Sequence, residues 1–79
     1  MLTVRYFAGA RAAAGVAGEQ IDAATVDKLV DVLVERHGER LAVVLKVAAF
    51  LVDGLACHDR SALLADAATV DVLPPFAGG

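Results

Sequence analysis

The 79-residue sequence predicts an α+β domain in which one main helix covers one face of a mixed sheet. Segments rich in strand-forming residues lie near opposite ends of the chain, "LTVRYF" and "TVDVL". Between them, residues 26–37 carry the periodicity of an amphipathic helix. Because no repeat, low-complexity tract or linker interrupts these segments, the chain has room for one domain.

The first strand is predicted over Leu2–Phe7. Its side chains alternate between two faces, with Leu2, Val4 and Tyr6 on one and Thr3, Arg5 and Phe7 on the other. The Ala-rich segment Gly9–Ala14 then predicts a short helical turn ended by Gly15, and Glu19–Asp22 predicts a second, short strand.

The main helix is predicted over Val26–His37. Thr25 is a suitable N-cap residue and Gly38 a suitable residue just beyond the helix end. Spacing of three and four residues places one apolar stripe on the helix: Val26, Leu29, Val30, Leu33, Val34 and His37. The acidic row Asp27, Asp31 and Glu35 lies on the flank, where we expect a solvated surface.

The second half of the chain predicts the rest of the sheet. Glu39–Leu45 is ambiguous and is assigned one further helical turn, while "VAAFLV" (Val47–Val52) predicts a central strand that is apolar on both faces. A turn at Asp53-Gly54 leads into a brief strand over Leu55–Cys57. Arg60–Asp66 is then expected to be a loop.

The last strand is predicted over Thr69–Leu73. Its alternation places Val70 and Val72 inward and Asp71 and Leu73 outward. We therefore expect a single domain over residues 1–73, followed by a flexible tail over residues 74–79.

Composition excludes several classes of function. The net charge is −3 and no run of Lys or Arg is present, which argues against nucleic acid as a partner. One cysteine permits no intrachain disulfide, and one cysteine with two scattered histidines predicts no metal site. The apolar stretch Leu41–Val52 contains Lys46 and is shorter than the roughly 20 residues that span a bilayer. We expect a soluble cytoplasmic protein.

The neighbours Cys57 and His58 are the side chains most easily mistaken for a catalytic pair. A nucleophilic cysteine needs an oriented base and a pocket, whereas adjacent strand residues point to opposite faces. A structural or incidental role is therefore expected for Cys57.

The chain ends in "LPPFAGG", and this ending has the properties of a reactive carboxylate handle. Pro74-Pro75 cannot continue a central strand, so they direct the chain out of the sheet. Six residues of about 3.3 Å each then reach about 20 Å. Without Cβ atoms, Gly78 and Gly79 fit a narrow channel and leave the terminal acyl carbon unhindered. The alternative is an ordinary frayed terminus.

Both ends of the sequence resemble the MoaD family, the small subunits of molybdopterin synthase among the ThiS/MoaD ubiquitin-like sulfur carriers. The family has "V-x-Y/F-F-A-x-x-R-x-x-x-G" near its start and "L/F-P-P-V-A/S-G-G" at its end. This chain has "VRYFAGARAAAG" (Val4–Gly15) and "LPPFAGG" (Leu73–Gly79), with "FLVDG" similar to the family's "AVNG". The resemblance covers essentially the whole chain.

The chain departs from the family at three places. "DAATV" stands where the family usually has "DGDEV", so Ala67 occupies a turn position where a positive φ is expected and the local turn is expected to differ. Phe76 replaces a valine and Asp53 an asparagine. None of these changes affects the terminal glycines.

The resemblance implies a ubiquitin-like β-grasp fold with the first and last strands parallel and adjacent. Phe7 and Leu73 would then be neighbours at the root of the tail and, with Phe76, would form an apolar patch where a partner docks. Alternatively, Phe7 packs beneath Ala10–Ala14.

The resemblance also implies a mechanism. An E1-like adenylating enzyme resembling MoeB would use ATP to adenylate the Gly79 carboxylate, and a persulfide sulfur would displace AMP to leave a thiocarboxylate. A large subunit resembling MoaE, in a heterotetramer, would receive the tail (Pro74, Pro75, Phe76, Ala77 and Gly78) in a channel. Sulfur would pass there to a pterin precursor. The partners would supply the catalytic side chains, and no cofactor would bind to this chain.

Other functions would use the same ending. The chain could carry sulfur for thiamine synthesis, as ThiS does, or for cysteine synthesis, although "YFA" and "PPFAGG" favour the first pathway. It could instead be a ubiquitin-like modifier joined to lysines through Gly79, or a β-grasp binding module with an inert tail.

Overall fold

The structure is a computed structural model that describes residues 1–75. The elements follow one another along the chain in the order β1 (Leu2–Tyr6), α1 (Ala8–Ala14), β2 (Gly18–Ile21), α2 (Val26–His37), α3 (Glu39–Val47), β3 (Ala49–Val52), β4 (Leu55–Ala56) and β5 (Thr69–Leu73). The bounds of α2 and β5 are those predicted from the sequence.

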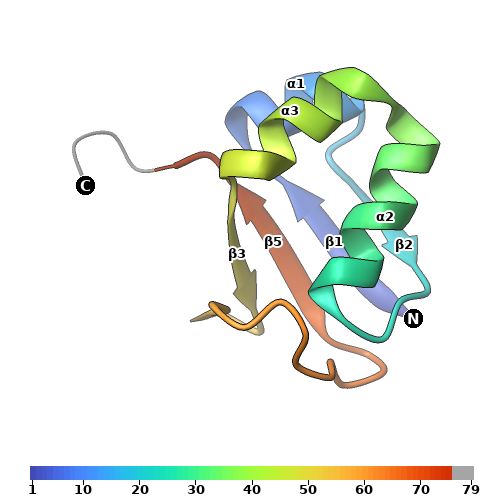
Figure 1. Ribbon diagram of the computed structural model, residues 1–79, viewed down its shortest axis with the longest axis vertical. Coiled ribbons are helices and arrows are strands. Elements are labelled where there is room, and N and C mark those ends of the chain that lie inside the picture. Colours follow the sequence, from blue (N-terminus) through green and yellow to red (C-terminus); the bar gives the residue numbers. More distant parts are fainter. Residues whose placement is uncertain (76–79) are drawn as a thin grey trace.

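The five strands of the described chain form one mixed sheet in the order β2-β1-β5-β3-β4. The first and last strands, β1 and β5, are parallel neighbours at its centre, with Val4 opposite Val70 and Tyr6 opposite Val72. The other pairs are antiparallel. Figure 1 shows the arrowheads of β1 and β5 pointing to the same edge of the sheet, where the chain leaves towards its C-terminus.

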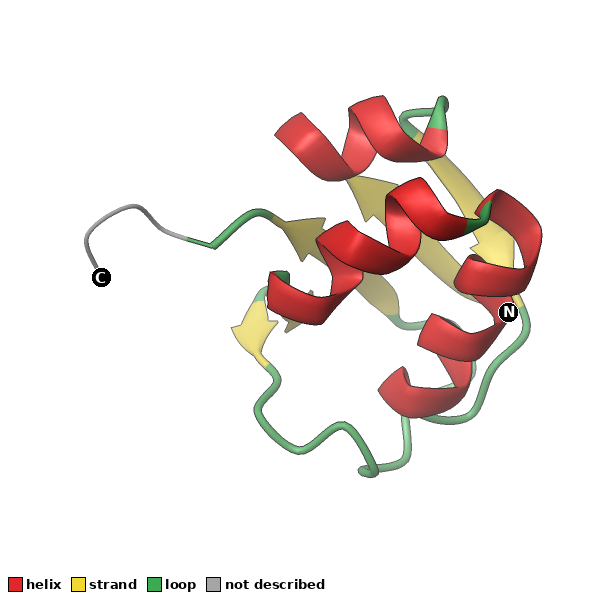
Figure 2. Ribbon diagram, turned by 45° about the horizontal axis from the view of Figure 1, so that its top comes forward, coloured by secondary structure: helices red, strands yellow, loops and turns green. Residues whose placement is uncertain are grey.

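All helices of residues 1–75 lie over the same face of the sheet, and the opposite face is open (Figure 2). Alternate residues of the strands point into the layer between sheet and helices, as period-2 alternation requires. The largest fully buried side chains are Leu2, Val4, Ile21, Val26, Leu29, Leu33, Leu41, Leu45, Val70 and Val72. The core therefore joins both ends of the chain to its middle.

The ends of α2 follow the predicted capping chemistry. Thr25 Oγ1 accepts a hydrogen bond from the backbone N–H of Lys28 at 3.2 Å. At the other end Gly38 has φ 83°, a region that favours glycine, and its N–H donates to the Val34 carbonyl. These contacts satisfy backbone groups that a helix end otherwise leaves without partners.

The prediction was wrong about the segment after Gly38. Glu39–Val47 forms the nine-residue helix α3 instead of a single further turn, so one main helix does not cover the sheet alone. Leu41 and Leu45 lie four residues apart on one side of the helix, and both are buried in the core. The helix continues because this spacing buries both side chains. As a result β3 begins at Ala49, not at Val47, which ends the helix.

The turns at the far edge of the sheet also differ in detail. Asp53 and Gly54 both have positive φ, 49° and 85°, as in the tight hairpin turn that "DG" predicts. The following strand β4 ends at Ala56, one residue earlier than expected. Ala67 is not among the residues with positive φ, so the missing glycine causes no backbone strain there.

None of the helices within residues 1–75 is long and apolar enough to cross a bilayer.

Candidate functional site

The root of the C-terminal tail is built by the two central strands. Because β1 and β5 are parallel, their carboxyl ends meet at one edge, and the Phe7 N–H donates to the Val72 carbonyl at 3.1 Å. On the other side of β5, Leu73 pairs with Ala49. Pro74 and Pro75 follow outside any strand, as expected for residues that cannot continue a ladder. The chain therefore leaves the sheet at its middle (Figure 1).

The predicted interface residues lie together at this root. Phe7 follows the last residue of β1 and is 39% exposed, while Leu73 ends β5 and is half-buried. Strand alternation and the parallel register place both on the open face of the sheet. The ring of Phe7 contacts the guanidinium of Arg5, whose carbon lies 5.9 Å from the ring centroid.

The remaining predicted residues, Phe76, Ala77, Gly78 and Gly79, lie outside the described part of the chain. The predicted roles of the tail and of the Phe7 and Leu73 patch therefore stay predictions.

The open face continues from the tail root across the sheet. The register places apolar side chains of three further positions on it: Ala49, Leu51 and Ala56. A pocket of about 440 Å³ lies at the β3–β4 edge of the sheet; its lining includes Arg60, whose guanidinium carbon lies 4.9 Å from the ring centroid of Phe50, a buried residue of the helix side. An uncovered apolar face next to the tail is the kind of surface that a protein partner covers.

An ion pair lies in the middle of this open face. Arg5 on β1 and Asp71 on β5 are register partners, and they form two hydrogen bonds: Nε to Oδ1 at 2.6 Å and Nη2 to Oδ2 at 2.9 Å. The carboxylate raises the pKa of the Arg5 guanidinium through these contacts. Asp71 is outward, as predicted, but only 10% of its side chain is exposed.

Sequence reasoning missed this pair, although its signal was present. Both residues were placed on the outward face, and both lie on strands expected to be parallel neighbours. Opposite charges at such positions attract across a ladder.

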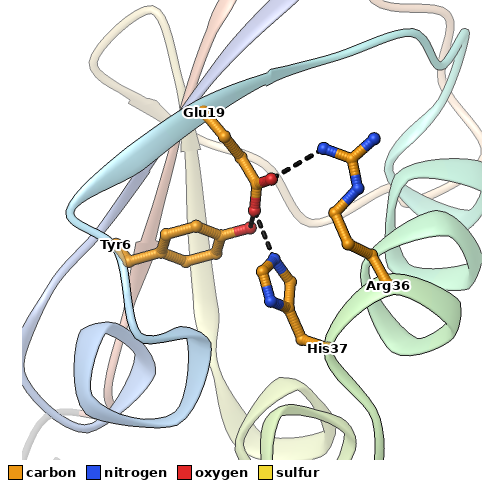
Figure 3. A network of polar contacts seen from close by, with 4 residues as sticks. All are labelled: Tyr6, Glu19, Arg36 and His37. Atoms are coloured by element: carbon orange, nitrogen blue, oxygen red, sulfur yellow. Dashed lines mark hydrogen bonds and ion pairs between the residues drawn. The ribbon is translucent and has the colours of Figure 1, made fainter.

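A second polar cluster lies on the helix side of the sheet, where β2 meets the end of α2 (Figure 3). Glu19 accepts a hydrogen bond from the Tyr6 hydroxyl at 2.5 Å and pairs with Arg36 at 2.8 Å. His37 Nε2 lies 2.5 Å from the same carboxylate oxygen that Tyr6 contacts. Figure 3 shows the three side chains converging on Glu19 from β1 and α2.

The environment of this cluster shifts two pKa values. Burial and the Glu19 hydrogen bond raise the pKa of Tyr6, so the phenol stays protonated and donates. Burial alone would raise the pKa of Glu19, but the hydrogen bonds from Tyr6, His37 and Arg36 together lower it. The cluster therefore holds a carboxylate that ties the end of α2 to the sheet. His37, predicted on the apolar stripe, has this structural partner.

The structure offers no catalytic setting for Cys57. Its sulfur donates to the Asp59 carbonyl at 3.4 Å, and no hydrogen bond joins it to His58 in the described chain. Within residues 1–75, no group of three His, Cys, Asp or Glu side chains could hold a metal ion.

Comparison with protein families finds a match to the ThiS family over residues 4–79. A search of the curated proteins finds no match.

Solved structures are similar over nearly the whole chain. A protein assigned as molybdopterin converting factor subunit 1 from Pyrococcus furiosus has 27% identity and a TM-score of 0.78, covering 95% of this chain and 97% of its own. A complex of subunits 1 and 2 of the molybdopterin-converting factor from Helicobacter pylori contains a chain with 26% identity and a TM-score of 0.75, covering 99% and 97%.

The small archaeal modifier protein 1 from Methanosarcina acetivorans has 21% identity and a TM-score of 0.79, covering 99% of this chain and 95% of its own, and shows the shared fold alone.

Proposed function

The chain belongs to the ThiS family and has the ubiquitin-like β-grasp fold, and on this basis we propose that it is a sulfur carrier whose C-terminal Gly79 becomes a thiocarboxylate. We further propose that it serves as the small subunit of a molybdopterin synthase. Two of the similar solved structures contain subunit 1 of a molybdopterin converting factor, with 27% and 26% identity to this chain. This similarity supports the pathway.

The observation that carries the proposal is the position of the tail root. The chain leaves the sheet at Pro74-Pro75 from a central strand, next to an open apolar face. A partner that covers this face through Phe7 and Leu73 is thereby placed to receive whatever follows Pro75. The sequence supplies Phe76, Ala77, Gly78 and Gly79 there, ending in a carboxylate that has no Cβ beside it.

The proposed chemistry begins with activation of that carboxylate. An E1-like adenylating enzyme transfers AMP from ATP to the Gly79 carboxylate and releases pyrophosphate. The terminal sulfur of a persulfide then attacks the acyl carbon and AMP leaves, which forms an acyl disulfide. A thiol reduces this acyl disulfide and is itself oxidised, leaving the thiocarboxylate on Gly79.

Delivery of the sulfur requires a second partner. We propose a large subunit resembling MoaE, in a heterotetramer, that binds the pterin precursor and supplies the catalytic side chains. The complex of subunits 1 and 2 from Helicobacter pylori supports such a partner. In this scheme the small chain contributes an acyl group and a docking face.

Intact mass spectrometry after co-expression with an E1-like enzyme and a sulfur source tests the chemistry. The expected result is a mass gain equal to replacing one oxygen by sulfur, and its loss when Gly78 and Gly79 are deleted. Adducts on lysines of other proteins would instead indicate a modifier. An unchanged mass would contradict the proposal.

The pathway is tested separately with the charged chain. Sulfur transfer to a pterin precursor in the presence of the large subunit supports molybdopterin synthesis. Transfer only to thiamine or cysteine precursors would assign the same carrier to another pathway.

A further inference from the structure

Resting on the proposed function, we propose that Arg5, held by Asp71, determines which partner the open face accepts. The partner is a large subunit whose docking surface is apolar and carries acceptor oxygens opposite Arg5. A partner surface that is apolar throughout, or that has a cation at this position, is rejected.

Arg5 has more hydrogen-bond donors than it uses on Asp71. A guanidinium has five N–H groups. Arg5 uses its Nε hydrogen and one Nη2 hydrogen on Asp71, so each carboxylate oxygen accepts one of these donors. The two Nη1 hydrogens and the second Nη2 hydrogen have no recorded acceptor within residues 1–75. Asp71 therefore fixes the orientation of the Arg5 guanidinium, whose planar set of N–H donors is called the fork below. The donors on its outer edge are available to a partner.

The outer edge of Arg5 lies among apolar side chains of the open face. Phe7 lies two residues beyond Arg5, just past the end of β1, and Leu73 lies two residues beyond Asp71 on β5. Leu51 is the register partner of Asp71 on the other side. A protein that covers these apolar side chains must also cover the Arg5 side chain, which is 54% exposed in the free chain.

Covering Arg5 with a partner surface costs free energy unless the partner supplies acceptors. Buried N–H donors without acceptors cost free energy, and a cation facing another cation is repelled. Carboxylate or carbonyl oxygens opposite the fork avoid both penalties, and the planar donors impose a direction on the contact. The ion pair thus sets specificity and register on a face that presents apolar side chains around it.

A purely structural role for the pair predicts a different behaviour. Partly exposed ion pairs contribute little to folding, and uncharged replacements are often as stable. Thr3 and Thr69 already form the register pair two residues earlier on the same face. The double variant Arg5→Thr/Asp71→Thr repeats that pair, removes both charges and keeps residues that suit strands.

The experiment measures binding of full-length chains to the subunit-2-type large subunit of the same organism by calorimetry, with thermal melting of each variant. We expect the Thr pair to melt near the wild type but to bind at least about tenfold more weakly, the factor for losing a hydrogen bond to a charged group. Arg5→Lys keeps the charge without the fork, and an intermediate loss is expected. Arg40→Met, on an exposed part of α3, is the control and should bind within about twofold.

The exchange variant Arg5→Asp/Asp71→Arg keeps the charges but moves the guanidinium to the neighbouring strand, about 4.8 Å away. It should bind as weakly as the Thr pair, and it provides the test if the Thr pair does not fold. Binding of either double variant within twofold of the wild type, or no binding of the wild type itself, would overturn the inference. Failure of the proposed function is read independently, as absence of the thiocarboxylate mass on the wild-type chain.

Discussion

Glu19 shows how a single side chain can tie two layers together. It lies on the short edge strand β2, yet its carboxylate contacts Tyr6 from β1 and both Arg36 and His37 from the last turn of α2. Arg36 also lies at the helix end, where positive charge is favoured by the helix dipole. One carboxylate thus pairs with the charge of Arg36 at the helix end while it accepts a hydrogen bond from the buried Tyr6 phenol.

Glu19→Gln tests this role through pH. The folded-state pKa of Glu19 is lower than its usual value of 4.5, so the folded chain binds fewer protons there than the unfolded chain. Its stabilising contribution is present above pH 4.5 and is lost as the pH falls through the lower folded value. We expect Glu19→Gln to lower the free energy of unfolding by about 1–2 kcal/mol at pH 7, as for a hydrogen bond to a charged group.

Urea unfolding of both proteins from pH 7 to pH 3 provides the measurement. The difference between wild type and Glu19→Gln should shrink below pH 4.5. Using the difference cancels the titration of other carboxylates. A difference that stays constant over the whole range would show that the carboxylate charge contributes nothing.

Cys57→Ser tests the absence of a thiol step on this chain. The cysteine sulfur donates only to the Asp59 carbonyl, and a serine hydroxyl can make the same contact. We expect normal formation of the thiocarboxylate and normal sulfur transfer, measured by intact mass and by pterin turnover. Loss of the thiocarboxylate in Cys57→Ser would mean that sulfur passes through this residue.

Among the elements, β2 depends on a close approach to β1. A Cβ added at Gly18 would lie 2.8 Å from the Val4 carbonyl oxygen, which belongs to the backbone of a central strand. Gly9 in α1 is the matched control, because a Cβ there would meet nothing within 4 Å. The two glycines therefore separate a steric requirement from the general flexibility of glycine.

We expect Gly18→Ala to destabilise the fold by about 1–3 kcal/mol, the usual cost of overpacking. Gly9→Ala should be neutral or stabilise the fold by up to about 1 kcal/mol, because alanine is favoured in helices. Thermal melting measures both, since about 1 kcal/mol corresponds to roughly 4–8 °C in a domain of this size. Equal melting temperatures for the two variants would contradict the steric argument.

For the molecule as a whole, stability and function are expected to reside in different parts of the chain. The buried core lies within residues 2–72, and its last strand ends at Leu73. A chain that lacks Gly78 and Gly79 should therefore melt within about 2 °C of the full chain, because every residue of the core described here is kept. It should still bind the large subunit through the open face, but it should support no sulfur transfer.

Calorimetry, melting and pterin turnover on the same truncated sample provide the test. Residual sulfur transfer would contradict the proposed role of Gly79. A lower melting temperature would show that the last two residues also contribute to the fold.

The sequence by itself determined the elements whose signals are local. The apolar stripe, Thr25 and Gly38 defined α2, and alternation defined β5, because capping and periodicity depend on neighbours within one turn or one strand. The ending "LPPFAGG" likewise predicted where the chain leaves the sheet. The family resemblance then predicted that the first and last strands are parallel neighbours.

The tertiary structure decided what depends on contacts between distant segments. Glu39–Leu45 is ambiguous from the sequence alone, and it belongs to the helix α3 because Leu41 and Leu45 are buried in the core. From the sequence, Asp71 is predicted to be an outward strand residue. In the structure it pairs with Arg5, 66 positions away. His37 is likewise predicted to be part of an apolar stripe, but in the structure its ring contacts Glu19 on β2. Such pairings arise only when strands and helices from different parts of the chain are brought together, so local patterns do not contain them.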